Sequence, residues 1–140
     1  MIGGSRLYRV YGVSPLWYRL VGADTDGHKP MALEDDVVQG VPDAVFVHRL
    51  FPLWLVADYK SRRMGKGPRA ADRYQVILYM GVLHRRPGFR LVRGLLQYQD
   101  RRTALRYQRR LDDKLRRLAP EARESRDRGK ALDSRPIHQR

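Results

Sequence analysis

The chain has 140 residues, of which 42% are hydrophobic, and this is enough for one compact domain built around a single core. Lysine and arginine total 29 against 15 acidic residues, a formal net charge of +14 at pH 7, so we expect the surface to attract polyanions, nucleic acid first and an acidic protein second. The chain contains no cysteine, which excludes disulfides, thiolate zinc sites, iron–sulfur clusters and a cysteine nucleophile.

The first half of the chain predicts short elements followed by two strands. Residues 1–30 mix aromatic and β-branched residues with glycine breaks, which predicts a short strand or helix pair. Residues 37–50 and 51–60 are rich in β-branched and aromatic residues and predict two strands, and the short gap between them predicts a hairpin. Residues 61–69 contain two glycines, a proline and several cations, which predicts a basic loop.

The second half alternates between helical and extended patterns. Apolar residues recur at three- and four-residue spacing in 70–84 and predict a helix, whereas 89–99 alternates like a strand. A leucine stripe predicts a second helix over 102–118. The order of elements predicts an α/β fold with a mixed β-sheet core flanked by α-helices. We expect residues 1–118 to form a single domain and 119–140 to form a basic polar C-terminal tail or solvated helix.

A buried strand that ends in charged residues is the most informative feature. The apolar run 53–57 leads directly into Asp58, and Lys60 follows two positions later. Because side chains alternate across a strand, Asp58 and Lys60 share one face, and an unpaired carboxylate there costs several kcal/mol. Asp43 lies fifteen positions earlier, on the neighbouring predicted strand. If the two strands pair, both carboxylates converge at one edge of the sheet.

Two converging carboxylates predict a metal site for a hard cation. Oxygen ligands without cysteine favour Mg²⁺ or Mn²⁺ over zinc, and an adjacent lysine suits phosphate chemistry. Glu34 either completes this site or is a solvated turn residue. Gln75 and Tyr79 are four positions apart and share one helical face, where they could hold a nucleic-acid strand or order the active site. The alternative is that Tyr79 is a core residue and Gln75 a surface residue.

Three segments in this order resemble one nuclease superfamily. They are LEDDVVQGVPDAVF, LWLVADYKSRR and DRYQVILYMGVL. Together they are similar to the PD-(D/E)XK nuclease superfamily, and within it to the RecB-like branch that includes the CRISPR-adaptation nucleases. In that branch a Gly-x-x-Asp strand precedes a hydrophobic strand that ends in Asp/Glu-x-Lys, and a helix with Gln-x-x-x-Tyr follows. The resemblance covers about residues 33–98 and implies a restriction-endonuclease-like core.

The resemblance implies a role for each matching residue. By position, Asp43 is similar to the first metal-binding aspartate, Asp58 to the acid before the lysine and Lys60 to the motif lysine. Gln75 and Tyr79 match the pair on the helix. These five residues are therefore the expected catalytic residues, and the two aspartates are the expected ligands of Mg²⁺ or Mn²⁺.

The chain departs from the branch at two points. Glu34 lies where the family often has an additional acid, but the upstream catalytic histidine of the branch has only His28 as a counterpart, in a loop close to the strands. His28 is either a metal ligand or a solvated loop residue. Many CRISPR-type relatives also carry an iron–sulfur cluster, which a chain without cysteine cannot hold. The resemblance therefore implies a cluster-free version.

Cations after the motif lysine are candidates for nucleic-acid binding. Arg62, Arg63, Lys66 and Arg69 either clamp phosphates beside the scissile bond or belong to a solvated turn. The arginines of 102–118 either follow a nucleic-acid backbone or form the polar face of an ordinary amphipathic helix.

These expectations combine into a metal-dependent DNA nuclease that hydrolyses phosphodiester bonds with little sequence specificity, in recombination, repair or phage DNA processing. Its partners would be single- or double-stranded DNA and proteins of a processing complex, and exonuclease and endonuclease action both stay open. One alternative is a non-catalytic nucleic-acid-binding or assembly subunit on a nuclease-like fold, and another is a scaffold for an acidic protein. The start of the chain lacks the apolar core of a signal peptide, and no stretch approaches the roughly 18 apolar residues of a membrane span. We therefore expect a cytoplasmic protein without a membrane partner. The small size and the arginine-rich composition are compatible with a bacterial or phage origin.

Overall fold

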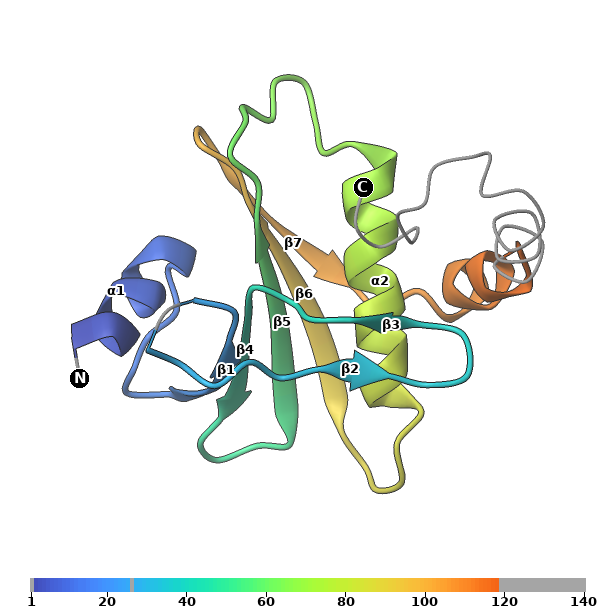
Figure 1. Cartoon of the computed structure of the whole chain (residues 1–140), viewed down its shortest axis with the longest axis horizontal. Helices are drawn as coiled ribbons and strands as arrows, with labels where there is room; N and C mark the ends of the chain where they lie inside the picture. Colours follow the sequence, from blue (N-terminus) through green and yellow to red (C-terminus); the bar gives the residue numbers. More distant parts are fainter. Residues whose placement is uncertain (1, 26, 119–140) are drawn as a thin grey trace.

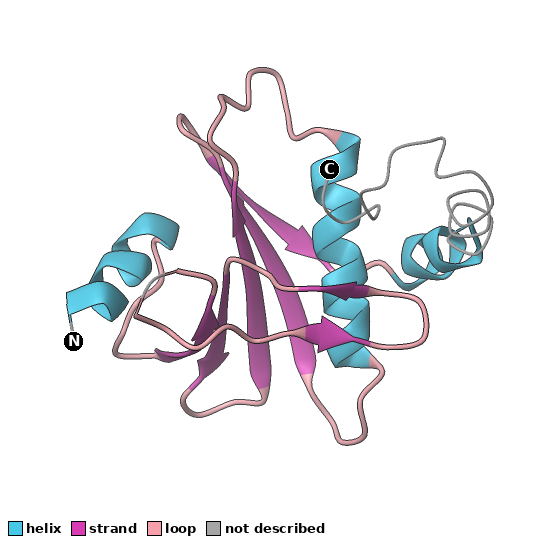
Figure 2. Ribbon diagram, viewed as in Figure 1, coloured by secondary structure: helices cyan, strands magenta, loops and turns pink. Residues whose placement is uncertain are grey.

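The computed structural model describes residues 2–25 and 27–118. A five-stranded mixed sheet runs between helices on its two faces (Figure 2). In chain order the labelled elements are α1 (Ile2–Tyr11), β1 (Tyr18–Ala23), β2 (Leu33–Glu34), β3 (Gln39–Gly40), β4 (Ala44–His48), β5 (Leu53–Tyr59), α2 (Ala70–His84), β6 (Leu91–Gln97) and β7 (Arg102–Arg106). A further helix covers 109–118, the end of the described residues.

The main sheet has the strand order β1-β4-β5-β6-β7. All neighbours are antiparallel except β5 and β6, which are parallel and are connected through α2. The predicted α/β fold, with a mixed sheet flanked by helices, is therefore confirmed. β2 and β3 form a separate two-stranded ribbon, which crosses over α2 (Figure 1).

The central strand β5 is covered on both faces. Val56 packs with residues of α2, whereas Leu55 and Ala57 pack with residues of α1. Figure 1 shows α1 and α2 on opposite sides of the sheet. Burial on both faces explains why β5 is a continuous apolar run rather than an alternating one. Asp58 has the same parity as Val56 and therefore points to the α2 side.

Helix α2 packs closely against β6 and the 109–118 helix because glycines at the two contacts have no side chain in the way. A Cβ on Gly94 of β6 would lie 2.7 Å from Cγ1 of Val76, so only glycine lets α2 approach the sheet this closely. A Cβ on Gly81 would collide with the carboxylate of Asp112, so Gly81 lets the 109–118 helix approach α2. The tight packing of α2 leaves most of its residues buried.

Three predicted elements are confirmed and two are corrected. The 70–84 helix, the strand within 89–99 and the hairpin of β4 and β5 are present. The strand predicted over 37–50 is broken, since β3 pairs with β2 and β4 begins only at Ala44, after a proline that cannot donate to a ladder. The described part of 1–30 contains one helix, α1, and one strand, β1, which pairs with β4.

The helix predicted over 102–118 is wrong in its first half. Arg102–Arg106 is strand β7, which satisfies the free edge of β6, and the helix begins only at 109. Leu105 is buried between exposed neighbours, as strand alternation requires. The unpaired N–H and C=O groups along the edge of β6 find partners in residues 102–106, and this pairing outweighs the helical spacing of the leucines. That spacing corresponds to a helix only from 109 onward. The predicted tail 119–140 lies outside the described residues.

None of the helices in the described ranges combines the length and the apolar character needed to cross a membrane.

Candidate active site

Asp43 and Asp58 lie next to each other where β4 begins and β5 ends. Ala44 pairs with Ala57 in the antiparallel register, so the next pair outward is Asp43 and Asp58. Oδ1 of Asp58 accepts a hydrogen bond from the backbone N–H of Asp43 at 2.9 Å. Oδ2 of Asp43 accepts one from the backbone N–H of Tyr59 at 2.7 Å. The structure thus brings together the two carboxylates that the sequence placed on neighbouring strands.

Burial raises the cost of ionising both carboxylates. Asp58 is only 3% exposed, and burial, followed by the nearby charge of Asp43, raises its pKa to about 7. Burial also raises the pKa of Asp43, against the lowering effects of the Tyr59 N–H and of Lys60. A pair with such raised pKa values carries less negative charge at neutral pH than two free aspartates. An additional cation beside the pair would favour the doubly ionised form.

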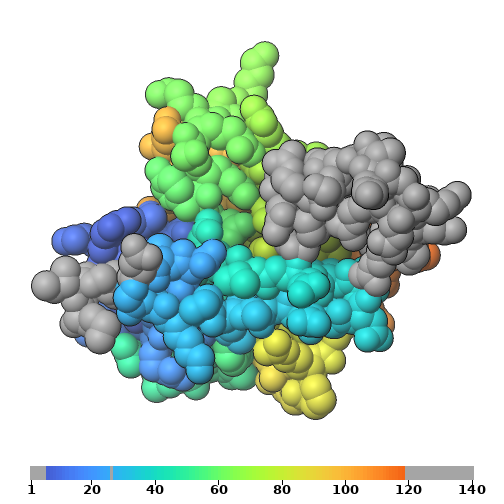
Figure 3. Space-filling model, in the orientation of Figure 1, coloured from blue at the N-terminus to red at the C-terminus, as the bar shows by residue number. Residues whose placement is uncertain are grey.

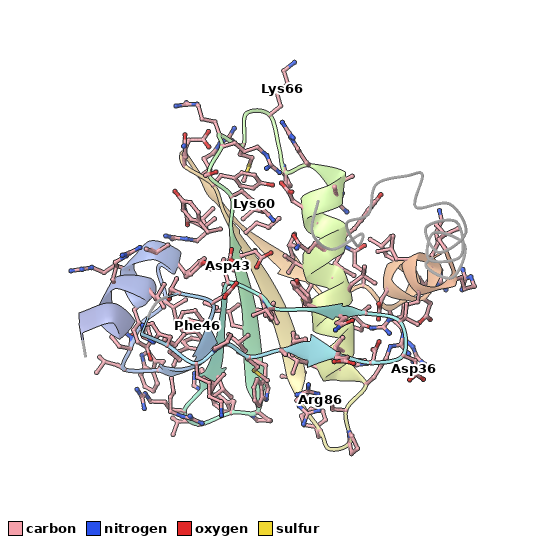
Figure 4. All side chains as sticks on the ribbon, viewed as in Figure 1. Asp36, Asp43, Phe46, Lys60, Lys66 and Arg86 are labelled. Carbon is pink, nitrogen blue, oxygen red and sulfur yellow. The ribbon has the colours of Figure 1, made fainter. Side chains whose placement is uncertain are left out.

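Lys60 lies on the same side of the sheet as Asp58. Its Nζ is 3.6 Å from Oδ2 of Asp58 and donates a hydrogen bond to Oε1 of Gln75 at 2.8 Å. Tyr59 between them is exposed, as alternation predicts. The backbone N–H of Lys60 donates to the carbonyl of Gln97 at 2.8 Å, so both its main chain and its ammonium are fixed. Figure 4 shows Lys60 and Asp43 at the same end of the sheet.

Gln75 and Tyr79 face this site from α2. Both are buried, so the interpretation of Gln75 as a surface residue is wrong. Burial first, and then the charges of Asp58 and Asp43, raise the pKa of the Tyr79 hydroxyl above its ordinary value. Tyr79 therefore belongs both to the core and to the surroundings of the carboxylate pair. One face of α2 therefore supplies two groups to the site, the Gln75 amide that binds Lys60 and the neutral phenol of Tyr79.

Tyr11 and Asp24 belong to the surroundings of the pair and were missed from the sequence. Tyr11 comes from the end of α1, and burial, followed by the charges of Asp43 and Asp58, raises its pKa. The backbone N–H of Asp24 donates to the carbonyl of Asp43 at 3.0 Å, and the charge of Asp24 contributes to the raised pKa of Asp43. The position of Asp24 directly after β1 could have indicated its role. That inference, however, requires knowing that β1 pairs with β4.

Glu34 and His28 do not join the pair. Glu34 is exposed on β2, opposite Gln39, and His28 lies in the loop after β1, where its backbone N–H donates to the carbonyl of Thr25. Within residues 2–25 and 27–118, no group of three or more His, Cys, Asp or Glu side chains is arranged to hold a metal ion. A divalent cation at this site would therefore have two side-chain ligands, Asp43 and Asp58, and its remaining ligands would be water or backbone oxygens. Buried carboxylates with raised pKa values fit such a cation.

The four basic residues after the motif divide into two kinds. Arg63, Lys66 and Arg69 are exposed, and Lys66 projects from the tip of the loop (Figure 4). This loop forms a prominent protrusion in the space-filling view (Figure 3). Arg62 instead turns inward and forms an ion pair with Asp72 of α2. Only the first three are placed to meet a ligand in solution.

Asp72 anchors the segment that carries Lys60. It is 1% exposed and accepts hydrogen bonds from Arg62 and, at 2.7 Å, from the hydroxyl of Tyr98. The carbonyl of Arg62 accepts from the N–H of Gln99 at 3.0 Å. Arg62 is therefore a structural residue that ties the loop to α2 and to the end of β6.

The arginines predicted to share one helix face are distributed over two elements. Arg102 and Arg106 are exposed on β7, whereas Arg116 of the 109–118 helix is largely buried. Arg116 bonds Oδ2 of Asp35 and Oδ1 of Asp112, each at 2.7 Å. It therefore connects the helix to the turn between β2 and β3, and the prediction of one continuous basic face is wrong.

Neither the protein-family models nor the curated proteins compared with this chain gave a match. The evidence for the chemistry of the site therefore comes from its own residues. These are two facing carboxylates on adjacent strand ends, one fixed ammonium group, and an amide and a phenol from the helix that covers them.

Proposed function

We propose that the chain is a Mg²⁺- or Mn²⁺-dependent nuclease of the PD-(D/E)XK type, which hydrolyses phosphodiester bonds in DNA with little sequence specificity. We further propose that it acts in the cytoplasm, in recombination, repair or phage DNA processing. The observation that carries the proposal is the facing pair Asp43 and Asp58, with Nζ of Lys60 3.6 Å from Asp58.

Asp43 and Asp58 would hold the divalent ion. Their backbone hydrogen bonds fix the direction of both carboxylates before any ligand arrives. When bound, the ion would supply Lewis-acid stabilisation of phosphate charge and would lower the pKa of water. Pre-organised ligands avoid the free-energy cost of ordering flexible side chains during the reaction.

Lys60 would bind the reacting phosphate. Gln75 accepts one of the three ammonium hydrogen bonds and thereby orients Nζ beside Asp58. An ammonium group held in this position would offset the negative charge that develops on a phosphate oxygen. The nearby side chain of Tyr79 keeps its proton, since its pKa is raised by burial and by the two aspartates, and so adds no charge to the site.

Arg63, Lys66 and Arg69 would hold the DNA backbone next to the site. All three are exposed and belong to the loop that begins directly after Lys60. Phosphate contacts position a strand without reading its sequence, which supports weak specificity. The net charge of +14 favours the same partner.

The test is a cleavage assay with linear, circular and single-stranded DNA in Mg²⁺, Mn²⁺ or EDTA. We expect cleavage by the wild type, no cleavage in EDTA, and at least about a 10²-fold loss in Asp58→Asn and Lys60→Ala. Asp36→Asn and Lys114→Ala are matched controls, because both residues are exposed and lie on other elements. Equal activity in all five proteins would refute the site assignment. Loss of linear DNA with survival of circular DNA would identify an exonuclease.

A non-catalytic nucleic-acid-binding or assembly subunit is the second candidate. The observation in its favour is that the described residues offer no group of three or more potential metal-ligating side chains. Titration calorimetry with Mg²⁺ and Mn²⁺ separates the two candidates. A nuclease should bind the ion in the wild type and lose binding in Asp58→Asn, whereas the subunit should show DNA affinity without carboxylate-dependent ion binding.

A further inference from the structure

Six large apolar side chains are exposed at the end of the sheet opposite the carboxylates. Their exposed fractions lie between 52% and 79%. We call them the hairpin-end patch: Leu16, Trp17, Leu50, Phe51, Phe89 and Leu91. Isolated exposed apolar residues are ordinary, but a contiguous group of this kind marks an interaction site.

Backbone and ring contacts bring together the three chain segments that carry the patch. The backbone N–H of Arg49 donates to the carbonyl of Trp17 at 2.7 Å, and the Trp17 ring stacks on His48 with centroids 6.0 Å apart. The rings of His48 and Phe51 are 4.9 Å apart. The N–H of Leu91 donates to the carbonyl of Pro52 at 2.7 Å, so the segment before β6 lies against the β4–β5 hairpin. Three chain segments therefore form one surface.

The patch is distant from the proposed active site. β5 begins at Leu53 beside the patch and ends at Tyr59 beside the carboxylates. Seven residues of extended strand span about 20 Å. Figure 4 shows Arg86, three positions before Phe89 in the sequence, well below Lys60 in the view. A ligand on the patch would leave the carboxylates accessible.

The chain segments that form the patch carry basic residues and no acidic ones, although Arg85 is paired with Asp112 and Asp113 of the 109–118 helix. The segments 13–21, 44–57 and 84–95 contain no aspartate or glutamate, but they contain several arginines. Arg49 and Arg86 are examples, and neither takes part in an ion pair with any described residue. An apolar centre with a cationic rim is complementary to an acidic surface that carries its own apolar side chains.

We propose that the hairpin-end patch docks an acidic protein segment with large apolar side chains. A second copy of the chain fits poorly, because a symmetric contact would bring two sets of patch segments together, each with arginines and no acidic residue of its own. A nucleic-acid strand would use the aromatic rings as stacking platforms, but three of the six residues are leucines, which offer no flat surface to a base. The leucines are buried effectively only by apolar side chains of a protein.

The test is selection of short random peptides displayed on phage against the full chain, followed by affinity measurement of the enriched peptides. We expect enriched peptides to combine aspartate or glutamate with leucine, phenylalanine or tryptophan. The double variant Leu50→Ser/Phe51→Ser and the charge variant Arg49→Glu should each weaken their binding at least about tenfold. Leu118→Ser, an exposed leucine on another element, should leave it unchanged.

Four results would overturn the proposal. They are enrichment of neutral or basic peptides, equal affinity in wild type and both patch variants, loss of oligothymidine binding in the patch variants, and a wild-type dimer that dissociates in these variants. The altered residues are exposed, and thermal denaturation verifies that each variant is folded. The DNA cleavage assay should give the same result for wild type and patch variants, so the docking proposal and the proposed nuclease function succeed or fail separately.

Discussion

Asp43 and Asp58 each accept a hydrogen bond from the other's strand. Asp58 Oδ1 takes the N–H of Asp43 at 2.9 Å, and Asp43 Oδ2 takes the N–H of Tyr59, the residue after Asp58, at 2.7 Å. This reciprocal arrangement fixes the orientation of both carboxylates. Burial raises the pKa values of both groups, and the charge of Asp43 raises that of Asp58 further.

The raised pKa of Asp58 predicts a stability that falls as pH rises. Its ordinary value is 3.8 and its folded value is about 7, so between these limits the folded chain binds a proton that the unfolded chain has released. The free energy of unfolding should therefore decrease from about pH 4 to about pH 7 through this group. Asp58→Asn should remove that decrease and should be at least as stable as the wild type at neutral pH.

The measurement is thermal or urea denaturation in EDTA across this pH range for wild type and Asp58→Asn. Asp36→Asn, an exposed acid on another element, controls for the loss of one carboxyl group. Parallel pH curves for wild type and Asp58→Asn would contradict the assignment of the raised pKa to Asp58.

Lys60→Ala should shift the pH dependence of cleavage as well as lower its rate. Lys60 lowers the pKa of both aspartates, so its removal raises these pKa values further. The carboxylates would then ionise, and hold a divalent ion, only at higher pH. We expect the acidic limb of the pH–rate profile to move to higher pH, together with a loss of about 10²-fold or more in kcat.

Lys114→Ala, on the 109–118 helix, should keep the wild-type profile. A fall in rate without any displacement of the acidic limb would show that Lys60 does not interact electrostatically with the pair.

Arg62 and Arg63 are adjacent in sequence, and their substitution should have opposite consequences. Arg62→Ala leaves Asp72 buried without its cationic partner and should cost about 3 kcal/mol of stability. The side chain of Arg63 is 77% exposed, so Arg63→Ala should change stability by no more than about 0.5 kcal/mol. Arg63→Ala should instead weaken DNA binding and reduce its salt dependence.

Urea denaturation and fluorescence anisotropy at several salt concentrations measure these two effects. If Arg62→Ala proved as stable as the wild type and lost DNA affinity, Arg62 would be a phosphate ligand and not a structural residue.

Gly81→Ala should destabilise the chain although alanine favours helices. The helix propensity of alanine would add roughly 1 kcal/mol relative to glycine. Against this, the new Cβ would overlap the carboxylate of Asp112, which is fully buried and bonded to Tyr107 and Arg116. Displacing this network should cost more than the gain, with a net loss of about 1–3 kcal/mol.

Gly67→Ala is the matched control, because a Cβ at that position would have no atom within 4 Å. Denaturation midpoints of the two variants decide the matter, and an unchanged or raised midpoint for Gly81→Ala would contradict the packing described between α2 and the 109–118 helix.

The sequence by itself determined the elements whose signals are local. The apolar run that ends at Asp58 predicted a strand buried on both faces, and alternation correctly placed Lys60 beside Asp58. The three- and four-residue spacing of apolar residues correctly predicted the helix Ala70–His84. These signals depend on the covalent spacing of neighbouring side chains, and at these two elements the tertiary contacts agree with them.

Only the tertiary structure decided which strand edges pair and which charges meet. The spacing of Leu105 with later leucines predicted a helix, but Arg102–Arg106 forms a strand that pairs with the free edge of β6. Asp24 and Tyr11 reached the carboxylate pair through β1 and α1, and Arg62 turned to Asp72 while Arg63 stayed in solvent. These outcomes depend on hydrogen bonds and desolvation between residues far apart in the chain, and no local pattern encodes such contacts.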